Sequence, residues 1–175
     1  WRFTGIAREC YLYARPKAHV ADLFVTPDLD KSYKNGVLNI VASTTGAAGK
    51  TLRFTLRDAD GKQVATQTVG AAETATIQLK AAGCKKWTAE TPYLYTLVTE
   101  LLDGSDVVEA IPQRVGFRKV EIKNAQLLVN GQTVLFKGAD RHELDPDGGY
   151  VVPVSRMVQD ISIMKDLNVN AVRTC

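Results

Sequence analysis

Short runs of β-forming residues, separated by turn signals, fill residues 18–120 and limit what this chain can fold into more than any other feature. We expect seven strands here, the first of them ended by Pro27. Asp-Gly pairs at residues 60–61 and 103–104 predict turns, the first as the two-residue connection of a hairpin. This many strands at this spacing predicts a two-sheet sandwich of the immunoglobulin type. The expected strands are residues 20–25, 37–42, 52–57, 64–69, 74–79, 95–102 and 107–115.

From Val120 onward the pattern becomes that of an α/β unit. An Asn-Gly pair at residues 130–131 predicts a hairpin over residues 127–136. The second strand of this hairpin should continue into residues 137–143, and a loop rich in Asp, Gly and Pro follows.

A helix and one more strand are predicted after this loop. Ser155 is the expected N-cap, and Asn168 should close the helix. Residues 169–172 have a strand pattern, so strand, helix and strand form a βαβ unit with parallel strands. The apolar stripe at helical spacing consists of Met157, Val158, Ile161, Met164 and Leu167.

The ends of the chain indicate a segment of a longer protein. The chain starts at Trp1 without an initiator Met or a leader, and it stops at Cys175 directly after an apolar run. Two strands and one helix cannot cover both faces of a parallel sheet. We therefore expect a fragment that holds a complete sandwich and the opening of an α/β domain. Its compartment stays undetermined.

Composition and charge exclude several classes of protein and of binding partner. The chain is 45% hydrophobic and 23% charged, with a formal net charge of +3, which excludes a disordered chain. Basic and acidic residues are interleaved, so we expect no nucleic-acid or anionic-membrane partner. No apolar run reaches the roughly 18 residues of a membrane span. Cys10, Cys84 and Cys175 are odd in number and lack metal-ligand spacing, which predicts reduced or buried thiols.

Three further features have simpler structural explanations than the sites they suggest. Residues 44–51 approach a phosphate-binding loop but lack its first Gly and a following helix, so we expect a hairpin loop. Residues 145–149 carry two carboxylates but lack the other ligands of a calcium loop, so we expect an acidic turn. His19 begins a strand without a partner pattern and is expected at the surface.

Two residues at predicted strand ends are the candidates for a site. His142 follows the first α/β strand in a polar cluster with Asp140, Arg141 and Glu143, and Arg173 ends the next strand. Active sites of α/β barrels and open sheets form at the carboxyl ends of parallel strands, so His142 and Arg173 could converge on one ligand. A structural salt bridge is the alternative.

Several segments resemble glycoside hydrolase family 2, and within it the β-galactosidases. The segments after residue 114 occur in the same order as in the family and at nearly the same spacing. Two segments nearer the start of the chain also resemble the family. These segments are residues 115–120 (VGFRKV), 128–131 (LVNG), 137–143 (KGADRHE), 157–161 (MVQDI) and 170–174 (NAVRT), with residues 86–95 and 1–9 before them.

The resemblance implies a mainly β fold, an immunoglobulin-like sandwich followed by the incomplete βαβ start of a TIM barrel. Residues 1–17 would be the tail of a preceding jelly-roll domain, residues 18–120 the sandwich, and residues 121–175 the first strands and helix of the barrel. Trp87 and Tyr95 are then aromatic residues of the sandwich core.

The resemblance also implies roles for single residues. His142 matches a family His that contacts sugar hydroxyls and helps to stabilise the transition state, and Arg173 matches an Arg in the floor of the pocket. Asp140, where the family often has Asn, is a further substrate-binding candidate. Both catalytic glutamates and the ligands for Mg²⁺ are expected beyond Cys175, so no catalytic residue, metal ligand or cofactor site is expected within these residues.

The implied function is retaining hydrolysis of terminal β-D-galactosides by a homo-oligomeric parent, in which the sandwich supports the barrel and this segment alone is inactive. A stand-alone carbohydrate-binding or adhesion module is one alternative, disfavoured because Phe54, Trp87, Tyr95 and Phe117 fall at inward strand positions. A β-glucuronidase or β-mannosidase of the same family is the other. The run of residues 141–146 favours the galactosidase.

Overall fold

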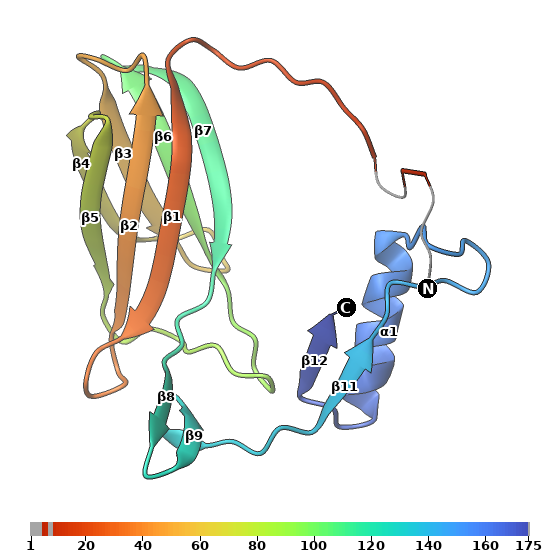
Figure 1. Cartoon of the computed structure of the whole chain (residues 1–175). Helices are drawn as coiled ribbons and strands as arrows, with labels where there is room; N and C mark the ends of the chain where they lie inside the picture. Colours follow the sequence, from red (N-terminus) through yellow and green to blue (C-terminus); the bar gives the residue numbers. More distant parts are fainter. Residues whose placement is uncertain (1–4, 7–8, 175) are drawn as a thin grey trace. The chain divides into compact units, whose positions relative to one another are not determined.

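Seven antiparallel strands of the computed structural model pair into two sheets, ordered β1-β2-β5 and β4-β3-β6-β7 (Figure 1). The structure describes residues 5–6 and 9–174. The chain divides into two compact units, residues 14–134 and residues 1–13 with 135–175. The seven strands are β1 (His19–Leu29), β2 (Gly36–Thr45), β3 (Thr51–Arg57), β4 (Gln63–Gly70), β5 (Thr74–Ala81), β6 (Tyr95–Asp103) and β7 (Asp106–Val115).

Some of the predicted features fall where the structure gives no description. In the predicted jelly-roll tail, residues 1–4 and 7–8 lie outside the described residues, and so does Cys175. Cys10 and Cys84 are free thiols. Burial raises the pKa of the Cys84 thiol, so this side chain is a poor nucleophile.

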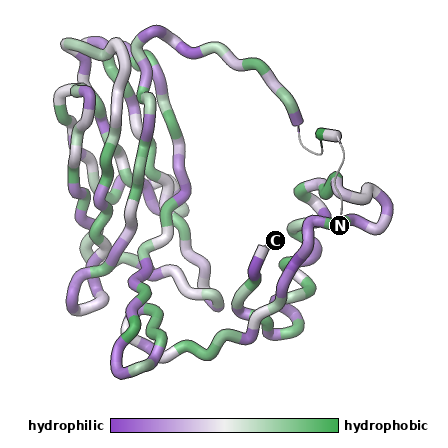
Figure 2. Tube along the Cα trace, in the orientation of Figure 1, coloured by the Kyte–Doolittle hydropathy of each residue, from purple (hydrophilic) through white to green (hydrophobic). Residues whose placement is uncertain are grey.

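Alternation of apolar and polar side chains builds the core between the two sheets. Along β6, Tyr95, Leu97 and Leu101 face inward and are at most 4% exposed. Figure 2 shows the same alternation as changes of colour along the strands. Phe54 and Phe117 are fully buried, each burial contributing about 1.5–3 kcal/mol. The predicted sandwich is thus confirmed, with Phe54, Tyr95 and Phe117 as inward aromatic residues.

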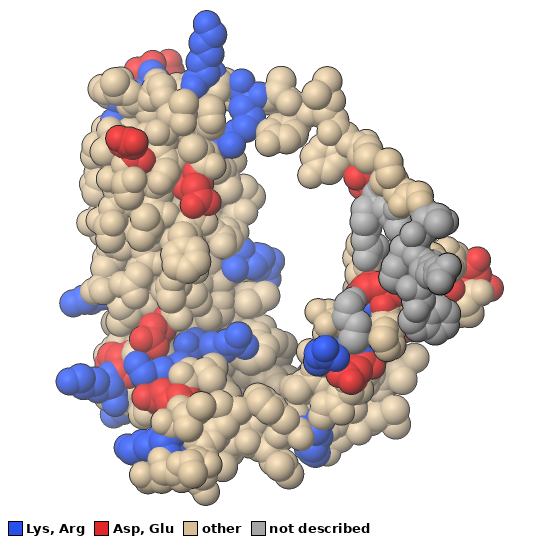
Figure 3. Space-filling view, viewed as in Figure 1, with Lys and Arg blue, Asp and Glu red and all other residues tan. Residues whose placement is uncertain are grey.

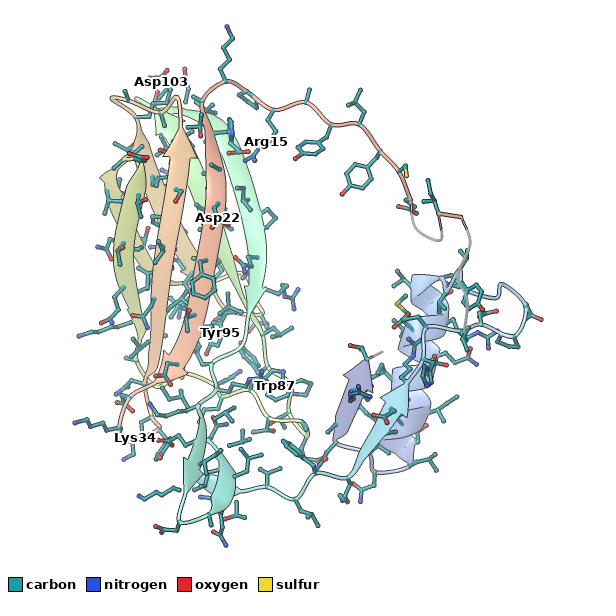
Figure 4. The ribbon with its side chains drawn as sticks, viewed as in Figure 1. Arg15, Asp22, Lys34, Trp87, Tyr95 and Asp103 are labelled. Atoms are coloured by element: carbon teal, nitrogen blue, oxygen red, sulfur yellow. The ribbon has the colours of Figure 1, made fainter. Side chains whose placement is uncertain are left out.

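Trp87 lies at the edge of this core rather than within it. Its ring is half-buried, and the Arg118 guanidinium carbon stands 4.8 Å from the ring centroid, a cation–π contact. Tyr95 lies deeper and packs edge-to-face on Phe117, with 5.2 Å between the ring centroids. Figure 4 labels Trp87 and Tyr95 near the end of the sandwich from which the chain continues into β8.

Pro27 does not end the first strand, contrary to the sequence prediction. β1 runs to Leu29 and pairs Pro27 with Leu38 of β2. β1 is an edge strand of its sheet, where a residue without an N–H is tolerated because that position need not donate to a neighbour. Pro112 occupies the equivalent kind of position in β7, the edge strand of the other sheet.

Two predicted connections differ from those in the structure. Residues 46–50 are not a hairpin loop, because β2 and β3 belong to different sheets and this loop crosses between them. The connection around Gly61 spans residues 58–62 instead of two residues. The Asp58 carboxylate accepts hydrogen bonds from the backbone N–H groups of Asp60 and Lys62. The turn after Asp103 forms as predicted, with Gly104 at φ 60°.

A small three-stranded sheet follows the sandwich. It consists of β8 (Val120–Lys123), β9 (Gln126–Val129) and β10 (Gln132–Thr133), ordered β10-β9-β8. Asn130 and Gly131 form the predicted turn of the β9–β10 hairpin, both with positive φ.

Asn130 also fastens this sheet to the sandwich. Its Nδ2 donates to the Trp87 carbonyl and its Oδ1 accepts from the Lys119 N–H, each at 3.0 Å. Beside it, the Tyr33 hydroxyl donates to the Glu121 carboxylate at 2.7 Å, and a Cβ on Gly131 would lie 2.9 Å from the Tyr33 ring. The small sheet is therefore held by specific contacts.

The second compact unit contains a parallel βαβ arrangement, as predicted. It comprises β11 (Gly138–Arg141), α1 (Val154–Asp166) and β12 (Ala171–Thr174). The second hairpin strand does not continue into β11, because β10 ends at Thr133 and residues 134–137 are not in a strand. Instead, Asn170, the residue before β12, hydrogen-bonds Leu135 and Lys137.

The ends of α1 differ in how well the sequence predicts them. Ser155 is not the N-cap, because the Pro153 carbonyl already accepts hydrogen bonds from Arg156 and Met157 and the helix begins at Val154. Asn168 closes the helix as predicted. It has φ 60° and donates to the Lys165 carbonyl, while Val169 donates to Met164, which is the Schellman pattern.

The apolar stripe of α1 remains largely uncovered in the described residues. Met157 and Met164 are half-buried, whereas Val158 and Leu167 are 60% and 72% exposed. No helix in the described part of the chain is long and apolar enough to cross a membrane.

On the face of the sandwich seen in Figure 3, basic and acidic side chains are intermixed.

Candidate functional site

The carboxyl ends of β11 and β12 bring two of the predicted site residues together. The strands are parallel, and their register places Asp140 opposite Arg173. The Arg173 Nη1 atom lies 3.6 Å from the Asp140 Oδ1 atom, and both side chains are mostly exposed. This pair occupies the end of a parallel sheet at which α/β proteins bind their ligands.

A shallow hollow lies beside this pair. It has a volume of about 290 Å³ and is lined by backbone and side chains of the two strands, including Gly138, Asp140, Ala171 and Arg173. Gly138 and Ala171 lie close together here, since a Cβ on Gly138 would be 3.3 Å from the Ala171 carbonyl oxygen. The hollow offers one carboxylate and one guanidinium group, which can bind hydroxyl groups as acceptor and donor respectively.

His142 lies one residue past β11, and its side chain is exposed. Its carbonyl accepts a hydrogen bond from the Leu144 N–H at 2.9 Å, which bends the chain away from the strand direction. The structure thus pairs Asp140 with Arg173 directly and positions His142 at the same strand end.

Arg141 has a structural role, on the opposite face of β11 from Asp140. It is 8% exposed, and its guanidinium donates to Asp160 of α1 at 2.8 and 2.9 Å and to Glu143 at 2.8 Å. The hydrogen bond to Asp160, followed by that to Glu143, raises the pKa of Arg141, which remains charged. The ion pairs of Arg141 tie the strand to the helix, and the salt bridge weighed as the alternative role for the strand-end residues is also present, between Arg173 and Asp140.

The acidic segment at residues 145–149 is a turn, as predicted. Asp145 is buried, and its Oδ1 accepts hydrogen bonds from the N–H groups of Asp147 and Gly148. Those backbone hydrogen bonds, from Gly148 and then Asp147, lower the pKa of Asp145, with a further contribution from Arg156. The other oxygen, Oδ2, accepts a hydrogen bond from Arg156 of α1 at 2.9 Å.

Among the described residues, the carboxyl groups whose surroundings clearly shift their pKa all have it lowered. A general acid in glycoside hydrolysis needs a raised carboxyl pKa. The surroundings lower the pKa of Asp145, and they also lower those of Asp30, Glu100 and Glu109 in the sandwich. In the described part of the chain, no three His, Cys, Asp or Glu side chains are grouped as metal ligands.

Predictions from sequence missed two residues that shape this site, Asp160 and Asn170. Asp160 lies between apolar helix positions, and only the tertiary structure shows that it pairs with Arg141. Asn170 falls inside the strand predicted over residues 169–172 but lies just before β12 in the structure, and its side chain binds backbone groups more than thirty residues away in sequence.

Models of two protein domains match nearly the whole chain. Residues 18–118 match the glycosyl hydrolases family 2 model, and residues 120–175 match the TIM barrel domain of glycosyl hydrolases family 2. The second match identifies the βαβ unit as the start of a TIM barrel.

Curated relatives and solved structures agree with these matches. A beta-galactosidase of Streptococcus thermophilus is 42% identical and one of Halalkalibacterium halodurans 40% identical, each over 99% of this chain. The chain spans only 17% and 18% of their lengths.

Among solved structures, two β-glucuronidases have the same fold. The enzyme of Bifidobacterium dentium matches with a TM-score of 0.83 and 28% identity, over 90% of this chain and 27% of that one. The enzyme of Ruminococcus gnavus matches with a TM-score of 0.80 and 27% identity, over 91% and 26%. On the domain models, which together cover the sandwich and the βαβ unit, the chain belongs to the family 2 glycosyl hydrolases.

Proposed function

We propose that this chain is part of a retaining β-galactosidase that hydrolyses terminal β-D-galactosides. The observation that carries the proposal is the identity of up to 42% with curated beta-galactosidases across 99% of the chain. The likeness to solved β-glucuronidases has a lower identity, 27–28% for the two described above. Both substrates are glycosides, so the two alternatives differ in the sugar and not in the class of reaction.

In this proposal, Asp140, His142 and Arg173 bind the sugar. Their place at the carboxyl ends of β11 and β12 supports the role, since TIM-barrel substrates bind at that end. Imidazole, guanidinium and carboxylate groups together supply donors and acceptors for sugar hydroxyls. The positive charge of Arg173 would favour a catalytic carboxylate nearby in its ionised, nucleophilic form.

The catalytic pair would come from other residues. Retaining hydrolysis needs two carboxyl groups about 5–5.5 Å apart, one as nucleophile and one as acid/base. Glu143, Asp145 and Asp160 are all bound to arginine side chains within this chain. We therefore propose that the chain by itself hydrolyses no glycoside. The Mg²⁺ of larger family members would likewise need ligands from elsewhere, since the described residues do not group as a metal site.

The sandwich would serve as a structural support, and the domain limits proposed are residues 1–17, 18–120 and 121–175. A carbohydrate-binding module would need exposed rings on which sugars stack. The sandwich buries Phe54, Tyr95 and Phe117 and half-buries Trp87, and among its described residues Phe24 on β1, 66% exposed, is a single exposed ring rather than a platform of several. The arrangement supports a role in holding the barrel, and we propose a homo-oligomer for the longer enzyme.

Hydrolysis of two chromogenic substrates tests the proposal. The longer protein that carries this segment is assayed with p-nitrophenyl β-D-galactoside and β-D-glucuronide, beside the 175-residue chain alone. We expect the longer protein to cleave the galactoside with retention of the anomeric configuration, and His142→Ala to lower kcat/KM by at least about tenfold. Turnover by the chain alone, or a preference for the glucuronide, contradicts it.

A further inference from the structure

Asn170 joins the residues before β12 to the residues before β11 through three hydrogen bonds. Its Oδ1 accepts from the Lys137 N–H, its Nδ2 donates to the Leu135 carbonyl, and its own N–H donates to the Lys137 carbonyl, each at 2.9 Å. The side chain therefore bonds the backbone on both sides of Phe136. All of these groups belong to one compact unit, so the contacts are internal to it.

The strands themselves specify their register only weakly. β11 and β12 have four residues each, and Gly138 faces Ala171, so few large side chains interlock. The hydrogen bonds of a parallel pair are evenly spaced, and a slip by one residue would move every side chain to the other face of the sheet. The contacts of Asn170 remove this ambiguity, because they hold Lys137 next to the residue that precedes Ala171.

The register decides which groups share the ligand-binding face. Arg141 contacts Asp160 of α1, so the alternation of β11 directs Asp140 to the face away from this helix contact. In the observed register Arg173 is opposite Asp140, and the two line the hollow of about 290 Å³. A slip of one residue would bring Val172 or Thr174 to that place.

We propose that Asn170 is a positioning residue, whose side chain sets the β11–β12 register and thereby places Arg173 beside Asp140 on the sugar-binding face. The use of this face for sugar rests on the proposed function. The role in register does not depend on it.

Two variants separate the contributions of the side chain. Asn170→Ala removes both side-chain hydrogen bonds. Asn170→Asp keeps the acceptor for the Lys137 N–H but sets an oxygen against the Leu135 carbonyl, so one bond remains and one becomes repulsive. Asn168→Gly is the matched control, since Asn168 is in the same loop at φ 60°, a conformation that Gly adopts readily.

The first measurement is NMR of the 175-residue chain, with cross-strand NOEs as the record of register. NOEs that link residues 138 with 171 and 140 with 173 are expected in the original chain and in Asn168→Gly. They should disappear in Asn170→Ala and weaken in Asn170→Asp. Their absence from the original chain, or their persistence in Asn170→Ala, overturns the proposal.

The second measurement asks whether the position of Arg173 matters for the reaction. In the longer protein, Asn170→Ala should lower kcat/KM for p-nitrophenyl β-D-galactoside by between about ten- and a hundredfold. If Asn170 acts through Arg173, Asn170→Ala should add little to the loss caused by Arg173→Ala. Additive losses overturn the positioning role. Loss of the NOEs, with Arg173→Ala as active as the original protein, would leave the register role standing and refute sugar binding by Arg173.

Discussion

Replacement of Asn130 tests how the small sheet is attached to the sandwich. The side chain is 7% exposed and joins the Lys119 N–H to the Trp87 carbonyl, with both hydrogen bonds at 3.0 Å. Its backbone lies at φ 53°, in the left-handed region that Asn tolerates better than Ala. The residue therefore combines two functions, a polar bridge and a turn conformation.

The expected cost of Asn130→Ala follows from these two functions. One part-buried donor and one part-buried acceptor lose their partners, at about 1–2 kcal/mol each, the lower part of the range for fully buried groups. Placing Ala in the left-handed region adds about 1 kcal/mol. We expect the free energy of unfolding to fall by about 3–5 kcal/mol, a large part of the roughly 5–15 kcal/mol of a typical domain. Asn130→Gly should cost about 1 kcal/mol less than Asn130→Ala, because it relieves the backbone strain.

Urea unfolding, followed by tryptophan fluorescence and circular dichroism, measures these differences. Asn124→Ala is the matched control, because Asn124 also has φ 53° but is exposed in the β8–β9 turn. It should lose only the backbone contribution of about 1 kcal/mol. If Asn130→Ala costs no more than Asn124→Ala, the two side-chain hydrogen bonds do not hold the sheet and the reasoning fails.

Three other changes probe the sandwich. Thr99→Val should raise the free energy of unfolding, measured by urea titration, by about 1 kcal/mol, because the buried Thr99 hydroxyl has no hydrogen-bond partner among the described residues. A lower free energy of unfolding would show that the hydroxyl does have a partner. Gly36→Ala should cost about 1–3 kcal/mol by the same assay, since its Cβ would lie 2.7 Å from the Phe117 ring, and an unchanged midpoint would contradict this packing. Burial raises the pKa of Glu109, but hydrogen bonds from the Val20 N–H and then Arg15 outweigh it and the net pKa is lowered. This group stabilises the fold above its unfolded pKa of about 4.3 and loses that effect as pH falls through its folded pKa. The urea concentration at the unfolding midpoint should therefore decrease as the pH falls below about 5, and this decrease should be less steep in Glu109→Gln. The same dependence on pH in the original chain and in Glu109→Gln would refute this.

Local sequence patterns were sufficient to predict the sandwich. Alternation fixed the strands around Phe54 and Tyr95, and Asn130-Gly131 fixed a hairpin, because these signals depend only on neighbouring residues. Pro27 misled the prediction because its tolerance depends on β1 being an edge strand. Ser155 did so because the preceding Pro153 already starts the helix. The first fact belongs to the tertiary structure, and the second to the local backbone at the start of the helix.

The site could be predicted only in part, for a related reason. The position of Arg173 at a strand end was visible in the sequence, but its pairing with Asp140 depends on a register that Asn170 sets from outside the strands. The apolar stripe of α1 was also visible in the pattern. Its periodicity predicts which face of the helix is apolar, and says nothing of what covers that face.

Hydrolysis of p-nitrophenyl β-D-galactoside by the longer protein that contains this segment tests the central claim most directly. The assay compares the original protein with Arg173→Ala, and p-nitrophenyl β-D-glucuronide serves as the competing substrate. We predict hydrolysis of the galactoside with the β-anomer as the first product, a fall in kcat/KM of at least about tenfold in Arg173→Ala, and little action on the glucuronide. A longer protein that prefers the glucuronide, or that cleaves the galactoside equally well without Arg173, would contradict the account.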